Sequence, residues 1–88
     1  MNINNDFKTK ISALPLDSFY VKYNDKKYLV TKHLFSNGNI IKIYGEELGG
    51  NDIVSGNYFL TIKNGLLKPC EMSDKKVIDF ILNLVVLK

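Results

Sequence analysis

The fold is decided by residues 19–44, which read FYVKYNDKKYLVTKHLFSNGNIIKIY. Apolar and polar side chains alternate in three runs, residues 19–23, 27–34 and 40–44, and a period of two predicts half-buried strands. Asn24-Asp25, between the first two runs, can adopt the positive φ angles that a tight hairpin needs. The second connection contains Asn37-Gly38, and Asn-Gly is the strongest short-range hairpin signal. Three consecutive antiparallel strands are therefore predicted.

The pattern continues on both sides of this stretch. Residues 53–63 read as a fourth strand that is bulged or bent at Gly56, and residues 66–68 read as a fifth that ends at Pro69. Before the strands, Phe7, Ile11 and Leu14 have the spacing of one helix face, which allows a short helix before Pro15. We expect residues 1–5 to be flexible, because they are polar and lead into no long apolar run.

The C-terminal segment predicts a helix that extends to Leu87. Ser73 is a good N-cap, and apolar residues follow with helical spacing from Val77 onward. Only a narrow stripe of this helix is polar, so it must pack against a sheet or a partner. The expected fold class is α+β: an antiparallel β-meander of about five strands, packed on one face by a C-terminal helix, with a possible short N-terminal helix, in a single domain of residues 1–88.

Hairpin register assigns each strand residue to one of two faces. The face expected beneath the helix carries Phe19, Val21, Tyr28, Val30, Leu34, Ile41, Ile43, Tyr58, Leu60, Ile62 and Leu67. The opposite face is half apolar, basic and, on this register, without an acid. One residue fits badly, because Lys32 falls on the core face. Its stem could extend past the helix edge, or a bulge could turn it outward.

Composition limits the class of protein. The chain has 88 residues, 45% of them hydrophobic, and a formal net charge of +3. This length has room for one core, with a total stability of roughly 4 to 13 kcal/mol. No apolar run approaches the 18 or so residues of a membrane span. Cys70 is the only cysteine, so no internal disulfide can form, and we expect the chain to be cytoplasmic.

Residues suited to catalysis or metal binding are sparse. His33 is the only histidine, so a zinc site with two imidazoles cannot form. Glu46, Glu47 and Asp52 surround Gly49-Gly50, which would suit a weak calcium or magnesium site, but a solvated connection explains them better. For Cys70 we expect a partly buried packing role. No metal or cofactor is expected, and the sequence favours a non-catalytic protein without deciding the question.

The basic and aromatic face is the best candidate for a binding site. Its predicted contact residues are Tyr20, Lys22, Lys27, Lys42, Tyr44, Phe59, Lys63 and Lys68. The leading hypothesis is a small protein-interaction or regulatory module that binds a protein partner or a second copy. The alternative is single-stranded nucleic acid, which such faces bind by stacking bases and contacting phosphates. All twelve basic residues are lysine, so sequence-specific reading of duplex DNA is less favoured.

Overall fold

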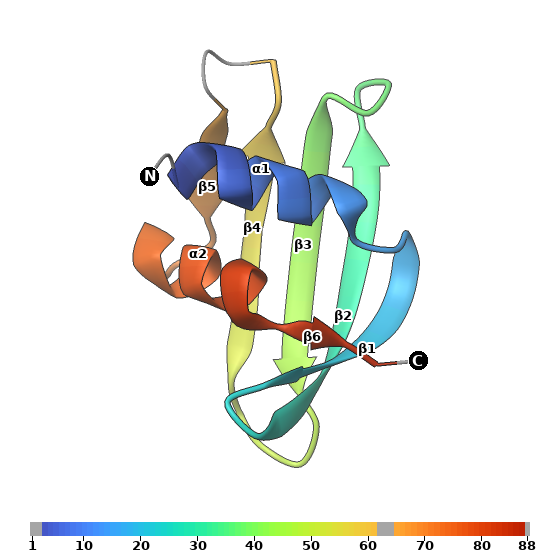
Figure 1. The fold of residues 1–88 in the computed structure, drawn as a ribbon, viewed down its shortest axis with the longest axis vertical. Helices are drawn as coiled ribbons and strands as arrows, with labels where there is room; N and C mark the ends of the chain where they lie inside the picture. The colour runs from blue at the N-terminus through green and yellow to red at the C-terminus, as the bar shows by residue number, and fades with distance from the viewer. Residues whose placement is uncertain (1–2, 62–64, 88) are drawn as a thin grey trace.

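Two helices lie on the same face of an open antiparallel sheet (Figure 1). The computed structural model describes residues 3–61 and 65–87. The elements are α1 (Ile3–Ala13), β1 (Asp17–Tyr23), β2 (Lys26–Phe35), β3 (Ile40–Glu47), β4 (Ile53–Phe59), β5 (Leu66–Pro69), α2 (Asp74–Asn83) and β6 (Val85–Val86). The sheet order is β5-β4-β3-β2-β1-β6. The predicted α+β meander, with a helix at each end of the chain, is confirmed.

The hairpin turns follow the local sequence. Asn24 and Asp25 have φ angles of 50° and 61°, as a two-residue turn between β1 and β2 requires. The turn sets Phe19 opposite Val30, and Gly38, with a φ of 89°, belongs to the connection that sets Leu34 opposite Ile41. The register predicted for these three strands is therefore confirmed.

The core is one cluster formed by the inner sheet face and both helices. From the predicted set, Phe19, Val21, Tyr28, Val30, Ile41, Ile43 and Tyr58 are buried, and Leu60 and Leu67 are partly buried. Leu34 was predicted to be buried but is 44% exposed, because β2 extends beyond the start of β1. The prediction for Ile62 lies outside the described residues. Val54 is fully buried although the prediction omitted it.

Helix α2 covers the centre of the sheet with Phe80. The Phe80 ring packs edge-on against Tyr23 and Tyr28, at centroid distances of 4.9 and 5.1 Å. Gly45 lies under the ring, where a Cβ atom would come within 3.3 Å of Phe80 Cζ. The helix begins as predicted, because the Ser73 side chain accepts a hydrogen bond from the Lys76 amide at 3.1 Å.

The predicted end of this helix is wrong. It stops at Asn83, and Leu84 adopts an extended conformation with φ −66° and ψ 153°. Val85 and Val86 then form β6, which pairs with Lys22 and Val21 at the outer edge of β1. Val85 and Val86 are both β-branched, and the edge of β1 that faces away from β2 offers them free hydrogen-bonding groups. These two features favour a strand over another helical turn.

The bulge predicted at Gly56 is also wrong. Strand β4 pairs with β3 and β5 in continuous register, and it ends at Phe59. Gly56 is needed for close approach instead, because a Cβ atom there would lie 3.1 Å from the Pro69 Cα. The part of the predicted strand at residues 62–63 lies outside the described residues.

Lysine side chains cap both helices at their C-terminal ends. Lys32 turns inward and is only 3% exposed, and its Nζ donates to the carbonyls of Ser12 and Leu14 at 2.9 and 2.8 Å. Lys10 of α1 donates to the carbonyls of Leu82 and Leu84 at 3.1 and 2.7 Å. Burial lowers the pKa of both ammonium groups. Lys32 therefore supplies donors where a helix leaves its last carbonyls unpaired.

Asp52 joins α2 to the sheet through two hydrogen bonds. Tyr28 Oη donates to Asp52 Oδ2 at 2.7 Å, and Lys76 Nζ donates to Oδ1 at 2.6 Å. The hydrogen bond from Lys76 is the largest cause of a lowered Asp52 pKa, and burial opposes it. Burial, reinforced by Asp52, raises the pKa of Tyr28.

We expect Asp52→Asn to remove part of the acid sensitivity of the fold. Because the pKa of Asp52 is lowered from 3.8 in the folded state, the unfolded chain binds more protons as pH falls below about 4, and folding stability is lost there. Urea unfolding from about pH 6 to about pH 2 should show a shallower decline for the variant. Asp25→Asn, which changes an exposed turn carboxyl, is the matched control. Parallel curves for Asp52→Asn and wild type would contradict the assignment.

Candidate functional site

The sheet face opposite the helices is uncovered in the described part of the chain. We call it the open face, formed by Ser18, Tyr20, Lys22, Lys27, Leu29, Thr31, His33, Phe35, Ile40, Lys42, Tyr44, Glu46, Ile53, Ser55, Asn57, Phe59, Leu66, Lys68 and Val85. Several of its large apolar side chains are exposed, including Tyr20, Phe35, Tyr44 and Leu66. Contiguous exposed apolar surface of this kind often marks a contact site.

Cross-strand pairing sorts these side chains into rows that run across the sheet. One row consists of Phe35, Ile40, Phe59 and Leu66, and the adjacent row consists of His33, Lys42, Asn57 and Lys68. Directly opposed residues have Cβ atoms about 5 Å apart, so each row is nearly continuous. An apolar stripe therefore lies beside a stripe that carries two lysines and a histidine.

A hollow of about 300 Å³ lies between β2 and β3 on the open face, lined by Thr31, His33, Phe35, Lys42 and Tyr44. Lys42 and Tyr44 belong to the predicted contact set. Thr31, His33 and Phe35 were not predicted as contact residues, although the alternation of apolar and polar residues along this strand already placed them on the same face. The Asn37-Gly38 turn could have identified them, because the register it sets pairs His33 with Lys42.

The structure separates the predicted contact residues into groups. Near the first hairpin, Lys27 Nζ lies 4.6 Å from the ring centroid of Tyr20, and Lys22 Nζ is 4.0 Å from Asp25 Oδ1. Lys42 and Tyr44 lie together on β3, while Phe59 and Lys68 lie on β4 and β5. Lys63 is outside the described residues. The role of the set in binding stays a prediction.

The expectation of a face without an acid is wrong. Strand β3 continues to Glu47, which places Glu46 opposite Leu29 on the open face. The face nevertheless remains basic, because four described lysines accompany this single carboxylate. They are Lys22, Lys27, Lys42 and Lys68.

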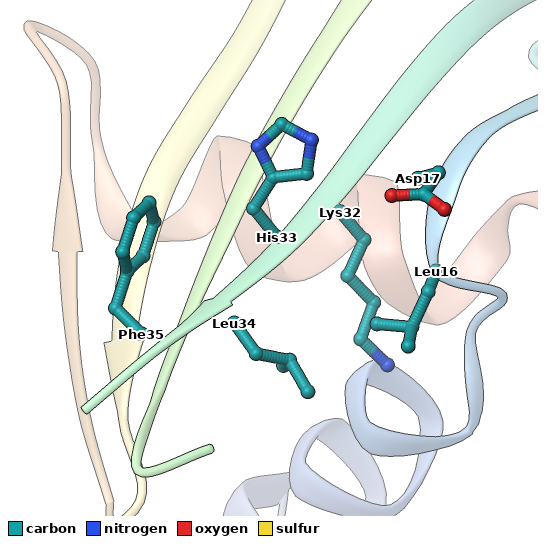
Figure 2. Close-up of a pocket in the computed structure, with 6 residues that line it drawn as sticks. All are labelled: Leu16, Asp17, Lys32, His33, Leu34 and Phe35. Carbon is teal, nitrogen blue, oxygen red and sulfur yellow. The ribbon is translucent and has the colours of Figure 1, made fainter. Parts of the chain in front are cut away.

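A second hollow, of about 310 Å³, lies where β2 extends past β1. Figure 2 shows its lining: His33 and Phe35 rise on one side of β2, and Lys32 and Leu34 lie on the other, with Leu16 and Asp17 across the gap. Residues 32–35 alternate between the two faces of the sheet, so they can line the same hollow only because the hollow lies at the edge of β2. This hollow and the one on the open face share His33 and Phe35.

A third hollow, of about 190 Å³, lies on the helix side of the sheet, lined by Phe7, Tyr58, Gly65, Leu66, Leu67, Asp74 and Ile78. Among the described residues, the buried Tyr58 Oη has no hydrogen-bond partner, and burial raises the pKa of this phenol. The phenol is therefore neutral at physiological pH and packs chiefly as an aromatic ring, edge-on to Phe7 at 5.0 Å.

The described ranges show no group of three or more His, Cys, Asp or Glu side chains placed to hold a metal ion. Cys70 was expected to be partly buried but is exposed. No helix within residues 3–61 and 65–87 is long and apolar enough to cross a membrane. Comparisons with protein families, curated proteins and solved structures found no match for this chain.

Proposed function

We propose that this protein is a non-catalytic interaction module of the cytoplasm, and that its open face binds an acidic segment of a protein partner. The observation that carries this proposal is the hollow on that face, which has two aromatic rings, Phe35 and Tyr44, beside Lys42 and His33. Aromatic side chains supply contact area at low entropic cost, and lysine selects for carboxylate.

Charge favours an acidic partner over a second copy of the chain. Stacking two open faces would bring four described lysines toward four others, with only Glu46 on each face to offset them. Like charges brought together in an interface oppose association. An acidic segment meets the same lysines with favourable electrostatics.

Single-stranded nucleic acid is the competing ligand, and the four described lysines of the open face would supply its phosphate contacts. Lys27, one of the four, lies over the Tyr20 ring. The chain also lacks arginine, whose planar side chain stacks on bases and binds phosphate through two hydrogen bonds. These features favour the protein partner.

We expect the double variant Lys42→Ala/Tyr44→Ala to lose peptide binding while it keeps its fold. A phage library of random peptides of about twelve residues is selected on the wild-type protein and counter-selected on the double variant. Enriched peptides should combine Asp or Glu with apolar residues, and their affinity should fall at least about tenfold on the double variant. Lys8→Ala/Lys75→Ala, which changes two exposed lysines on the helices, is the matched control and should bind like wild type.

Two further measurements separate the alternatives. If an oligothymidine of about twelve nucleotides binds, with log affinity falling against log salt at a slope of about −2.8 for four lysines, and no peptide is enriched, the ligand is nucleic acid and the proposal is wrong. If light scattering shows a dimer that dissociates in the double variant, the face serves self-association instead.

A further inference from the structure

Within residues 3–61 and 65–87, no strand pairs with β2 beside Leu34 on the side where β1 lies. The pairing of β1 with β2 stops at Asp17 opposite Lys32, whereas β2 continues to Phe35. In the same register the residue opposite Leu34 would be Pro15, which has no amide hydrogen to donate. Asp17 has a φ of 67°, and the chain turns there toward α1.

Hydrogen bonds determine which way the Leu34 backbone faces. The Lys27 carbonyl accepts a hydrogen bond at 2.8 Å from the amide of Leu48, the residue directly after β3, and the Phe35 carbonyl accepts one at 3.1 Å from the Gly38 amide. Backbone groups alternate sides along a strand, and β2 pairs with β3 without interruption. The amide and carbonyl of Leu34 therefore face the side on which no described strand lies.

The unpaired edge coincides with the hollow of Figure 2. Leu16 and Leu34 are exposed on its helix side, and His33 and Phe35 are exposed on its open-face side. Since His33 and Phe35 also line the hollow on the open face, the edge and that face form one continuous surface.

We propose that the partner's acidic segment binds as an extended strand at this edge, antiparallel to β2, with one residue hydrogen-bonded to both backbone groups of Leu34. This inference rests on the proposed function and adds its binding mode. Peptides that extend a sheet gain affinity from main-chain hydrogen bonds, while side-chain hollows select their sequence.

The side chains on the two faces of the sheet beside this edge determine which residue types the bound segment should have. The residue opposite Leu34 projects to the helix side, toward Leu16 and Leu34, where an apolar side chain fits. The residue before it lies beside Phe35 and should also be apolar or aromatic. The residue after it lies beside His33, in the row that contains Lys42, and should be Glu rather than Asp, because its carboxylate must reach past the Asp17 carboxylate, which lines the same hollow, toward Lys42. Asp17 then limits the segment, because it already occupies the place opposite Lys32.

The experiment uses the strongest peptide from the selection above. Each backbone nitrogen is methylated in turn, which removes one hydrogen-bond donor and leaves the protein unchanged. We expect methylation of the residue opposite Leu34 to weaken binding about tenfold, and methylation of either neighbour to weaken it less, because those amides point away from β2. Hydrogen exchange at the Leu34 amide should slow when the peptide binds.

A protein variant gives an independent test. Leu34→Pro removes the amide that faces the free edge together with the leucine side chain, and proline is tolerated at such an edge, so binding should weaken at least as much as it does for the methylated peptide. Leu34→Val keeps this amide and shortens the same side chain, so it should weaken binding less than Leu34→Pro, while Lys8→Ala/Lys75→Ala should bind like wild type. If peptides are enriched but neither methylation nor Leu34→Pro weakens them, and Leu34 exchange is unchanged, strand pairing is wrong and the proposed function stands. If no peptide is enriched over the double variant, both fail.

Discussion

Replacing Phe80 with alanine is expected to lower the free energy of unfolding by about 3 to 5 kcal/mol, a large share of the total for a chain of this size. Phe80 is fully buried, and its ring contacts the rings of Tyr23 and Tyr28. Gly45 beneath it has no side chain that could move into the space left behind. Urea unfolding at neutral pH, followed by far-ultraviolet circular dichroism, measures the loss.

The control for this prediction lies on the same helix. Lys75→Ala changes an exposed position and should alter stability by no more than about 0.5 kcal/mol. A loss below about 1 kcal/mol for Phe80→Ala would mean that α2 is not an integral part of the core, and the packing described above would be wrong.

Lys32→Ala is expected to destabilise the fold by about 2 to 4 kcal/mol, a large effect for a lysine on a strand. The substitution removes a buried stem and leaves the carbonyls of Ser12 and Leu14 without their donor. The midpoint and slope of urea unfolding measure this effect, with Lys8→Ala as the exposed-lysine control.

Lys32→Met separates packing from hydrogen bonding. Methionine keeps most of the stem but cannot donate, so the loss should shrink to about 1 to 3 kcal/mol. A methionine variant as stable as wild type would show that the cost of burying the ammonium cancels the benefit of its two hydrogen bonds, contrary to our interpretation.

The sequence was most informative at the hairpin turns, where the conformation depends on the turn residues themselves and not on distant contacts. Asn24-Asp25 and Asn37-Gly38 adopt conformations that few other residue pairs tolerate, and they set the register of β1, β2 and β3 correctly. Once the register is known, alternation assigns each side chain to a face. The same reasoning placed Lys42 and Tyr44 on one face, where the structure brings them together around a hollow.

The sequence-based predictions failed where the conformation of a segment depends on contacts with residues that are distant in the chain. Val85 and Val86 fit a helix face equally well, and the unpaired edge of β1 decides in favour of β6. Lys32 seemed misplaced on the core face because the helix end that it caps is eighteen or more residues away in the chain. The hollow at Leu34 likewise depends on where β1 begins relative to β2, which residue types alone do not reveal.

The two capping lysines also bear on how the fold opens. Lys32 of β2 holds the end of α1, and Lys10 of α1 holds the end of α2. If α1 lifts away, the last carbonyls of both helices lose their donors in the same event, although the two helices are separated by the entire run of strands from β1 to β5. Local opening of one helix is thus energetically coupled to the other, and the smallest cooperative unit on this side of the sheet comprises both.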